Sequence, residues 1–127
     1  METEAMVSQA QDTGLAELVS AIVADDVVKW LGWGTGSGQG VTDTGLATEA
    51  AESRTDGTPS AQTTTTTGDT FRVTGTITAG GTRAITEVGI FDASTGAALR
   101  FYADFSVLNL NSGDSITFTI DIVLDQG

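Results

Sequence analysis

The second half of the chain alternates apolar and polar side chains with a period of two, and this pattern restricts the fold more than any other feature. The run "DTFRVTGTITA", residues 69–79, places Phe71, Val73 and Ile77 on one side and Arg or Thr on the other. A period of two is that of a β-strand, and a polar opposite face is typical of an antiparallel sheet that is wet on one side. The pattern therefore predicts half-buried strands.

Further runs repeat the pattern after short turns rich in Gly, Asp and Asn. They cover residues 83–93, 99–105 and 115–124, and the turns are Gly80-Gly81, "DASTG" (92–96) and "NSGD" (111–114). The side chains expected to face the core are Leu99, Phe101, Ala103 and Phe105, and then Ile116, Phe118, Ile120, Ile122 and Leu124. Closely spaced strands without intervening helices predict a mainly β fold, an antiparallel β-sandwich or jelly-roll-like domain.

The first half supplies one helix and one strand, so we expect a single domain over residues 1–127. Its expected parts are a flexible N-terminal arm (1–11), an amphipathic helix (12–24), a first strand (27–33), a Gly-rich loop (34–40) and the antiparallel β-domain (50–124). The helix carries an apolar face at i, i+3, i+4, i+7 and i+8 from Leu15. Within the β-domain, we expect two polar edge strands around the turn 56–59. The threonine run 63–67 favours extended backbone because threonine is β-branched.

The charge balance excludes several classes of protein. Acidic residues number 17 against 5 basic ones, for a net charge of −12. A basic nucleic-acid-binding face is therefore not expected, and the chain has no apolar run long enough for a transmembrane helix. The acidic N-terminus does not resemble a signal peptide. The acidity has two interpretations that stay open, a surface that keeps a repetitive assembly soluble or an adaptation to molar salt.

The segment "GWGTGSGQG", residues 32–40, invites comparison with phosphate-binding loops. A P-loop requires Lys after its last glycine, and a dinucleotide fingerprint requires a third glycine where Gln39 stands. Lys29 is the only lysine and precedes the segment. We therefore expect no nucleotide site and interpret the segment as a mobile surface loop.

The side chains available for chemistry are few, because the chain has no histidine and no cysteine. The remaining candidates for paired-carboxylate catalysis are Asp92, Asp104, Asp114 and Asp121. Acids at strand ends and turns usually bond their own backbone, and the spacing of a calcium-binding loop is absent. We predict no enzyme activity and no catalytic, cofactor-binding or metal-binding residues.

Glu87 stands inside the otherwise apolar strand "ITEVGIF". If Ile85, Gly89 and Phe91 face inward, Glu87 does too and needs a partner, which Arg72 or Arg83 could provide. If Val88 and Ile90 face inward instead, Glu87 lies on the wetter face. The sequence leaves both alternatives open and favours a structural role in either case.

Several stretches resemble, in order, small structural proteins of tailed viruses. They are "KWLGWGTGSG" (29–38), "TDTGLATEAAESRTDGT" (42–58), "DTFRVTGTITA", "AITEVGIFDASTGAAL" (84–99) and "LNSGDSITFTIDI" (110–122). The pattern is similar to that of capsid cement, or decoration, proteins, which are β-sandwich or jelly-roll proteins bound outside the major capsid shell. Similar strings occur in tail-fibre and tail-collar proteins.

The resemblance implies a virion structural protein on the outer surface of a tailed-virus head, made in the host cytoplasm. Its implied partners are the major capsid protein and further copies of itself, as a dimer or trimer. The expected partner contacts are Leu15, Leu18, Ile22, Trp30, Trp33, Gly34, Gly36 and Gly38. In that role the Gly-rich loop would be an adaptable contact whose deletion leaves the fold intact. The alternatives are a tail, fibre or baseplate component, which is generally longer, and, more remotely, a glycan-binding or glycan-hydrolysing domain.

Overall fold

The computed structural model describes residues 12–124, and the predicted N-terminal arm over residues 1–11 lies outside them. The elements are α1 (Asp12–Asp25), β1 (Trp30–Gly34), β2 (Thr55–Asp56), β3 (Thr58–Gln62), β4 (Thr70–Thr78), β5 (Arg83–Phe91), β6 (Leu99–Leu110) and β7 (Ser115–Val123). The mainly β fold class and the helix are confirmed. The first strand begins at Trp30, three residues later than predicted.

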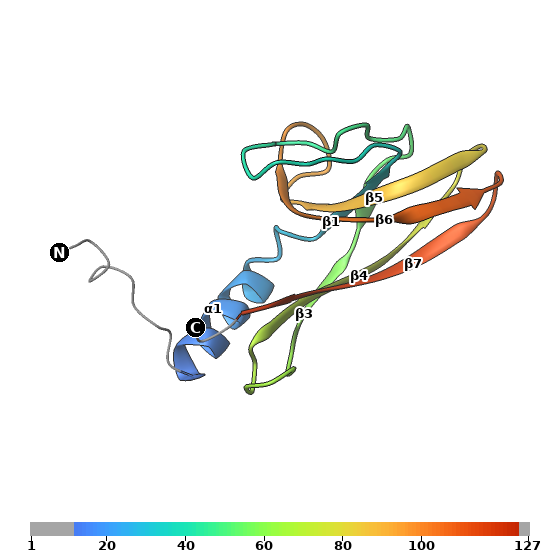
Figure 1. The fold of residues 1–127 in the computed structure, drawn as a ribbon. Helices are drawn as coiled ribbons and strands as arrows, with labels where there is room; N and C mark the ends of the chain where they lie inside the picture. Colours follow the sequence, from blue (N-terminus) through green and yellow to red (C-terminus); the bar gives the residue numbers. More distant parts are fainter. Residues whose placement is uncertain (1–11, 125–127) are drawn as a thin grey trace.

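The strands form two antiparallel sheets that face each other as a sandwich (Figure 1). One sheet has the strand order β2-β1-β5-β6 and the other has the order β3-β4-β7. The polar edges predicted around residues 56–59 are present as β2 and β3, but they pair with different sheets. The backbone therefore crosses from one sheet to the other at Gly57. A Cβ atom at this position would lie only 2.9 Å from a Val73 methyl carbon, so the crossing point is too tight for a larger residue.

The core lies between the sheets and continues to the helix. Its buried members are Val19, Leu31, Trp33, Phe71, Val73, Ile77, Ala79, Ile85, Val88, Ile90 and Phe118. Aromatic pairs join the two sheets: Phe71 lies 6.4 Å from Phe101, and Trp33 meets the Phe118 ring edge-on at 6.4 Å between centroids. The face of β4 that was predicted to be apolar is the face that packs here.

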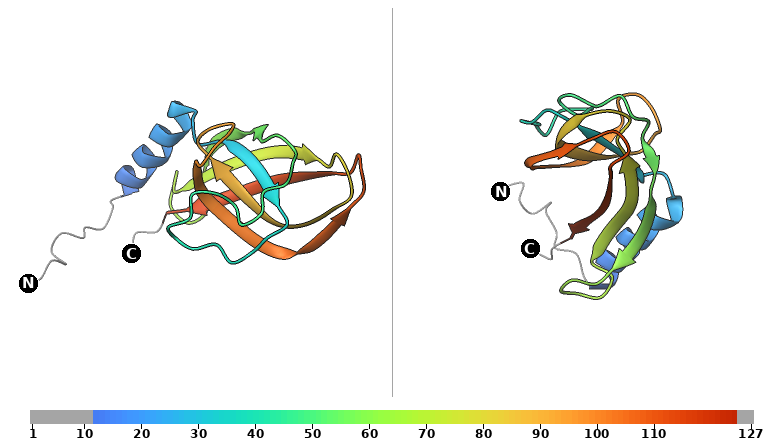
Figure 2. Two further views of the ribbon diagram at one scale, coloured as in Figure 1. Left: turned by 90° about the horizontal axis from the view of Figure 1, so that it is seen from above. Right: turned by 90° about the vertical axis from the view of Figure 1, so that its right-hand side faces the viewer.

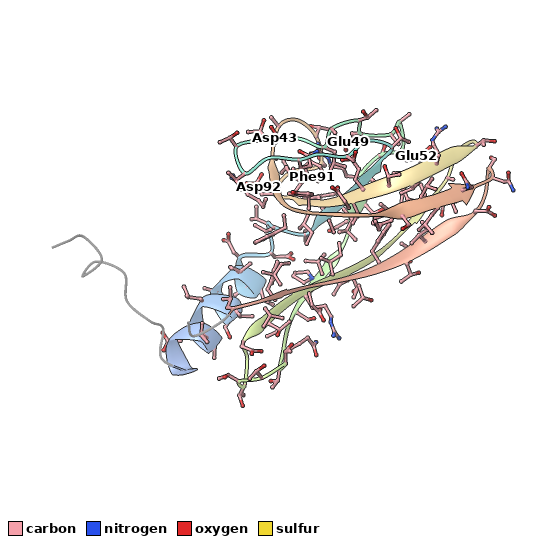
Figure 3. The ribbon with its side chains drawn as sticks, in the orientation of Figure 1. Asp43, Glu49, Glu52, Phe91 and Asp92 are labelled. Carbon is pink, nitrogen blue, oxygen red and sulfur yellow. The ribbon has the colours of Figure 1, made fainter. Side chains whose placement is uncertain are left out.

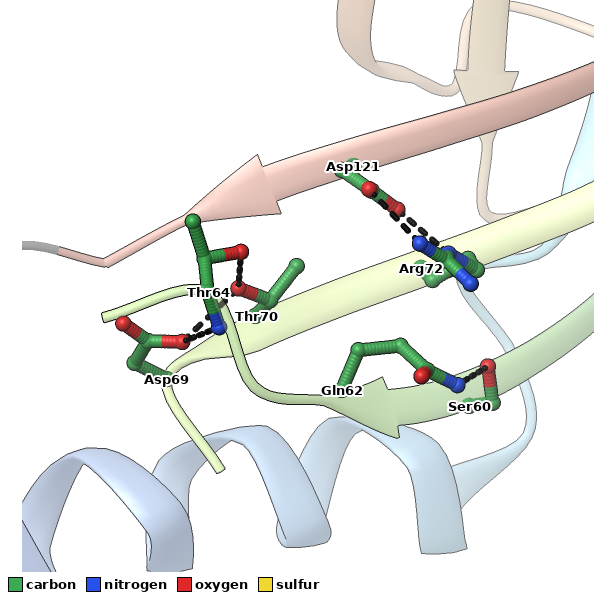
Figure 4. A network of polar contacts seen from close by, with 7 residues as sticks. All are labelled: Ser60, Gln62, Thr64, Asp69, Thr70, Arg72 and Asp121. Carbon is green, nitrogen blue, oxygen red and sulfur yellow. Dashed lines mark hydrogen bonds and ion pairs between the residues drawn. The ribbon is translucent and has the colours of Figure 1, made fainter. Parts of the chain in front are cut away.

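The threonine run does not form the extended strand that its β-propensity predicted. Residues 63–67 instead make a turn that wraps around the buried carboxylate of Asp69. That carboxylate accepts hydrogen bonds from the backbone N–H groups of Thr64, Thr65 and Thr66 and from the Thr70 hydroxyl, at 2.8–3.0 Å. Figure 4 shows Thr64 and Thr70 beside this carboxylate. These donors hold the pKa of Asp69 well below its usual range. Hydrogen bonding to a fixed charge therefore overrides the intrinsic preference of threonine here.

The last two strands are less buried than the alternation predicted. Of the side chains expected inside β7, only Phe118 is buried, and Ile116, Ile120 and Ile122 are half-buried. In β6, Leu99 faces the opposite side, because a register shift at the start of the strand turns it toward Gly89. The cause of the partial burial is architectural: β6 and β7 are edge strands of different sheets and do not pair with each other. Figure 2 (right) shows the two strands in different layers, and a hollow lined by residues of both lies between them.

Candidate functional site

Glu87 faces away from the sandwich core, and this orientation decides between the two alternatives that the sequence left open. Val88 and Ile90 face the core, and Gly89 shares the outer side with Glu87. A register shift between Ile85 and Glu87 lets Ile85 face the core as well, because a bulge changes the alternation of side chains. The outer side is not wet, however: Glu87 is 0% exposed.

The Glu87 carboxylate is held by hydrogen-bond donors of the segment that follows β1. Its Oε2 accepts from the backbone N–H groups of Gly36 and Thr48, each at 3.0 Å. Its Oε1 accepts from the Ala47 N–H at 3.2 Å and the Gln39 side-chain amide at 3.3 Å. The suggested partners Arg72 and Arg83 are wrong, because the former pairs with Asp121 and the latter with Glu52. A buried carboxylate is thus satisfied by neutral donors.

The Gly-rich segment forms the near wall of this carboxylate site. A Cβ atom on Gly34 would collide with the Thr48 carbonyl oxygen and the Glu87 carboxylate, and one on Gly36 would lie 2.7 Å from Ala47 Cβ. The segment's glycines therefore allow close approach to an internal anion instead of a bound phosphate. Deletion of residues 34–40 was expected to leave the fold intact, but the structure favours the opposite outcome, because Gly34 belongs to β1 and the Gly36 N–H donates to Glu87.

Residues 35–54, here called the covering loop, lie across the outer side of the sheet that contains β5. Arg54 secures the far end of this loop: its guanidinium stacks 3.5 Å from the centroid of the Phe91 ring. It also forms a two-point ion pair with Glu49 and donates to the Ala93 and Gly96 carbonyls of the β5–β6 turn. Figure 3 shows Glu49 and Phe91 together on this side of the sheet. The loop is therefore a third layer of the domain.

Glu52 links the covering loop to the core. Its carboxylate accepts from the Trp33 indole N–H at 2.7 Å, from the Gly80 backbone N–H and from the Arg83 guanidinium. The charge-assisted bond from Arg83, followed by the indole and backbone donors, lowers the pKa of Glu52 from 4.5 to about 2. Trp33 thus fills the core and satisfies its polar edge within the fold.

This pKa predicts an acid-dependent stability difference between the wild type and Glu52→Gln. Because the folded-state pKa is the lower one, the carboxylate's contribution is complete above about pH 4.5 and disappears as the pH falls through about 2. The variant should lose about 1–3 kcal/mol of unfolding free energy at neutral pH, and the difference should shrink in acid. Urea denaturation of both proteins from pH 7 to pH 2 measures it. Other carboxylates titrate equally in both proteins, so a difference that is constant down to pH 2 contradicts the assignment.

The acids considered for catalysis are not brought together into one paired site. Asp92 bonds Arg100, and Asp121 bonds Arg72 through both oxygens at 2.7 and 3.0 Å. Asp114 accepts from the backbone N–H of Asn111 inside the β6–β7 turn, as expected for turn chemistry. Asp104 is exposed on β6. No group of three or more acidic side chains within residues 12–124 is placed to hold a metal ion.

The predicted partner contacts divide into buried and accessible residues. Leu15 and Trp33 are 3% and 1% exposed, so they are core residues and offer no surface to a partner. Gly34 is buried as well, and Gly36 lies against Glu87. Trp30 and Ile22 are half-buried, whereas Gly38 and Leu18 are exposed, the latter at 55%. Only the exposed and half-buried residues remain available for a binding role.

An apolar groove between β6 and β7 is the surface that sequence reasoning missed. One hollow of about 550 Å³ is lined by Ala103, Phe105, Ser106, Leu108, Phe118, Thr119, Ile120 and Asp121. A second, of about 690 Å³, continues it toward the covering loop and shares Ala103, Ile120 and Asp121. Of these residues, periodicity predicted Ala103, Phe105, Phe118 and Ile120 to face the core. Phe105, Phe118 and Ile120 do so, whereas Ala103 is exposed. Periodicity carries no information on whether the two sheets close over such side chains.

Comparisons with protein-family models, with curated proteins and with solved structures gave no match to this chain. Across the described residues 12–124, the helix is too short and not apolar enough to span a membrane.

Proposed function

We propose that this chain is a virion structural protein, a decoration protein that binds the outer surface of a tailed-virus head and stabilises it. Its partners would be the major capsid protein and further copies of the chain. The proposal starts from the sequence resemblance, which covers most of residues 29–124. The β-sandwich is the fold that the resemblance implies.

The observation that carries the proposal is the way the charged groups are used. All five basic side chains form ion pairs: Lys29 with Asp26 and Asp56, and the four arginines with Glu49, Asp121, Glu52 and Asp92. The buried acids Glu87 and Asp69 bind backbone N–H groups of their own chain. These pairs and hydrogen bonds stabilise the fold, and they engage every basic side chain. The exposed surface also carries apolar side chains such as Val107 and Leu108. Such a surface suits association through area better than it suits chemistry.

The test is the number of copies in purified particles. Quantitative mass spectrometry against the major capsid protein should find hundreds of copies in a simple ratio to the shell protein. A handful of copies, in threes or sixes, would move the protein to the tail or baseplate. Absence from particles would reject a virion role altogether.

A further inference from the structure

The strip around the β6–β7 turn differs in charge from the rest of the molecule. Residues 105–120 contain one charged residue, Asp114, although the whole chain has 17 acids and 5 bases. The strip also holds exposed apolar side chains: Val107 is 50% exposed and Leu108 is 41% exposed. It borders the groove described above. The strip is therefore a nearly uncharged band, with two exposed apolar side chains, on a strongly acidic protein.

Most of the free edge of β7 lies in this strip, and the edge lacks the usual protection against pairing. Edge strands are commonly blunted by bulges, prolines or charges. β6 has such a break, the register shift opposite Thr86, but β7 pairs with β4 without interruption from Ser115 to Val123. The single charge on β7, Asp121, is engaged by Arg72, as Figure 4 shows. The other side of β7 is thus a regular nine-residue strand edge without a partner strand in the described chain.

A second copy of this chain is the occupant that the charges favour. A basic partner would gain most at the acidic surfaces, and the strip offers it almost no charge. For two copies that each carry a net charge of −12, the strip is instead the place where they meet with least like-charge repulsion. A contact between identical patches also has the closed symmetry typical of soluble dimers.

We propose that two copies join β7 to β7 in antiparallel orientation across a twofold axis, forming one six-stranded sheet. Side chains alternate between faces, so only registers that place apolar residues opposite apolar residues are acceptable. The register centred on Thr119 pairs all nine residues and places Phe118 opposite Ile120 of the partner copy. Asp121 then lies opposite the partner's Thr117. The two Asp121 residues are about 13 Å apart along the strands, farther than the Debye length of about 8 Å in physiological salt.

The dimer would also cover the groove. The half-buried side chains Ile120 and Ile122 line it from β7, and Phe101 and Phe105 do so from β6. A paired copy extends the β3-β4-β7 sheet past the edge of β7, on the side of the groove that faces β6. It thereby removes part of this apolar surface from water. Dimer formation would explain why β6 and β7 carry apolar side chains that are only half-buried in the single chain.

A cysteine variant tests the proposed axis on the purified full chain, which contains no other cysteine. Thr119→Cys places two thiols opposite each other across the axis, at a Cα separation within reach of a disulfide. Under mild oxidation it should give a covalent dimer. The matched control is Thr76→Cys, a threonine that is also exposed and lies on the same face of the same sheet, but on the central strand β4. It should stay uncrosslinked.

Two lysine variants test the register, with the dimer dissociation constant measured by sedimentation. Thr117→Lys faces the partner's Asp121 and should strengthen the dimer by about 2- to 5-fold for each of the two pairs. Thr119→Lys lies opposite the same substituted position of the partner copy. The two like charges should weaken the dimer by a similar factor. Both variants change the net charge equally, so a general charge effect would move them together.

The dimer does not depend on the capsid assignment, because it is measured without particles. A wild-type mass equal to two chains, together with selective crosslinking at residue 119, supports it. A monomer at all accessible concentrations overturns it and leaves the groove for a different partner chain. A dimer that crosslinks equally at residue 76, or responds equally to both lysines, overturns the proposed surface.

Discussion

Glu87→Ala is expected to destabilise the fold by at least ~3 kcal/mol, which is a large share of the ~5–15 kcal/mol that stabilises a typical domain. The substitution removes both acceptor oxygens of a fully buried side chain and leaves the part-buried N–H groups of Gly36, Ala47 and Thr48 without their acceptor. An unsatisfied buried donor costs about 1–3 kcal/mol. Chemical denaturation gives the free energy, and the thermal midpoint should fall by roughly 10–20 °C.

The control is Asp104→Ala, which removes the acid directly across from Glu87 on the neighbouring strand β6. Asp104 is exposed and has no basic partner among the described residues, so its loss should change stability by less than about 0.5 kcal/mol. Glu87→Gln is the more selective change: it keeps one acceptor but turns an NH₂ group toward backbone donors. The loss of stability in Glu87→Gln should therefore lie between those of Glu87→Ala and Asp104→Ala. Equal, small effects for Glu87→Ala and Asp104→Ala would show that the covering loop is held by other contacts.

Hydrogen exchange separates a local effect from a global one. In Glu87→Ala, the amides of Gly36, Ala47 and Thr48 should exchange much faster, because they lose their acceptor. The exchange rates of the β4 amides should increase only by the factor that the loss of global stability predicts, since that strand belongs to the other sheet. Uniform acceleration would mean that the loop and the sandwich unfold as one unit.

Local periodicity was sufficient to predict the strands, because side-chain alternation is a property of a few consecutive residues. It identified the inward face of β4, the turns at 92–96 and 111–114, and the helix to within one residue at its C-terminal end. It could not predict the pairing of strands distant in sequence. It therefore missed that β2 and β3 separate into different sheets and that β6 and β7 leave a groove open between them.

The role of Glu87 was beyond reach for a related reason. The orientation of Glu87 depends on the register shift in the pairing of β5 with β6. Its hydrogen-bond donors come from residues 36–48, about forty to fifty positions earlier in the chain. Arginine is the partner that a sequence suggests for a buried acid, whereas the donors here are mainly backbone N–H groups, which every sequence contains. The one available signal was the coincidence of an acid inside an apolar strand with a glycine-rich segment that could approach it closely.

Three alanine substitutions, one at the end of β1 and two in the covering loop, should therefore have graded effects that depend on geometry rather than on glycine content. Gly34→Ala forces a methyl group into the Thr48 carbonyl and the Glu87 carboxylate and should cost about 2–3 kcal/mol. Gly38→Ala has open space but a φ of +83°, so it should cost about 1–2 kcal/mol. Gly45→Ala has neither restriction and should be neutral or slightly stabilising.

Chemical denaturation of the three variants measures this order, and the order distinguishes two descriptions of the segment. If the segment were a flexible joint, each glycine would contribute only conformational freedom, and alanine would have a similar small effect at all three positions. If it is the wall of an internal carboxylate site, Gly34 must be the most sensitive, because its hydrogen atom occupies the space where the loop, β1 and Glu87 meet. The ranking Gly34, then Gly38, then Gly45 follows only from the second description.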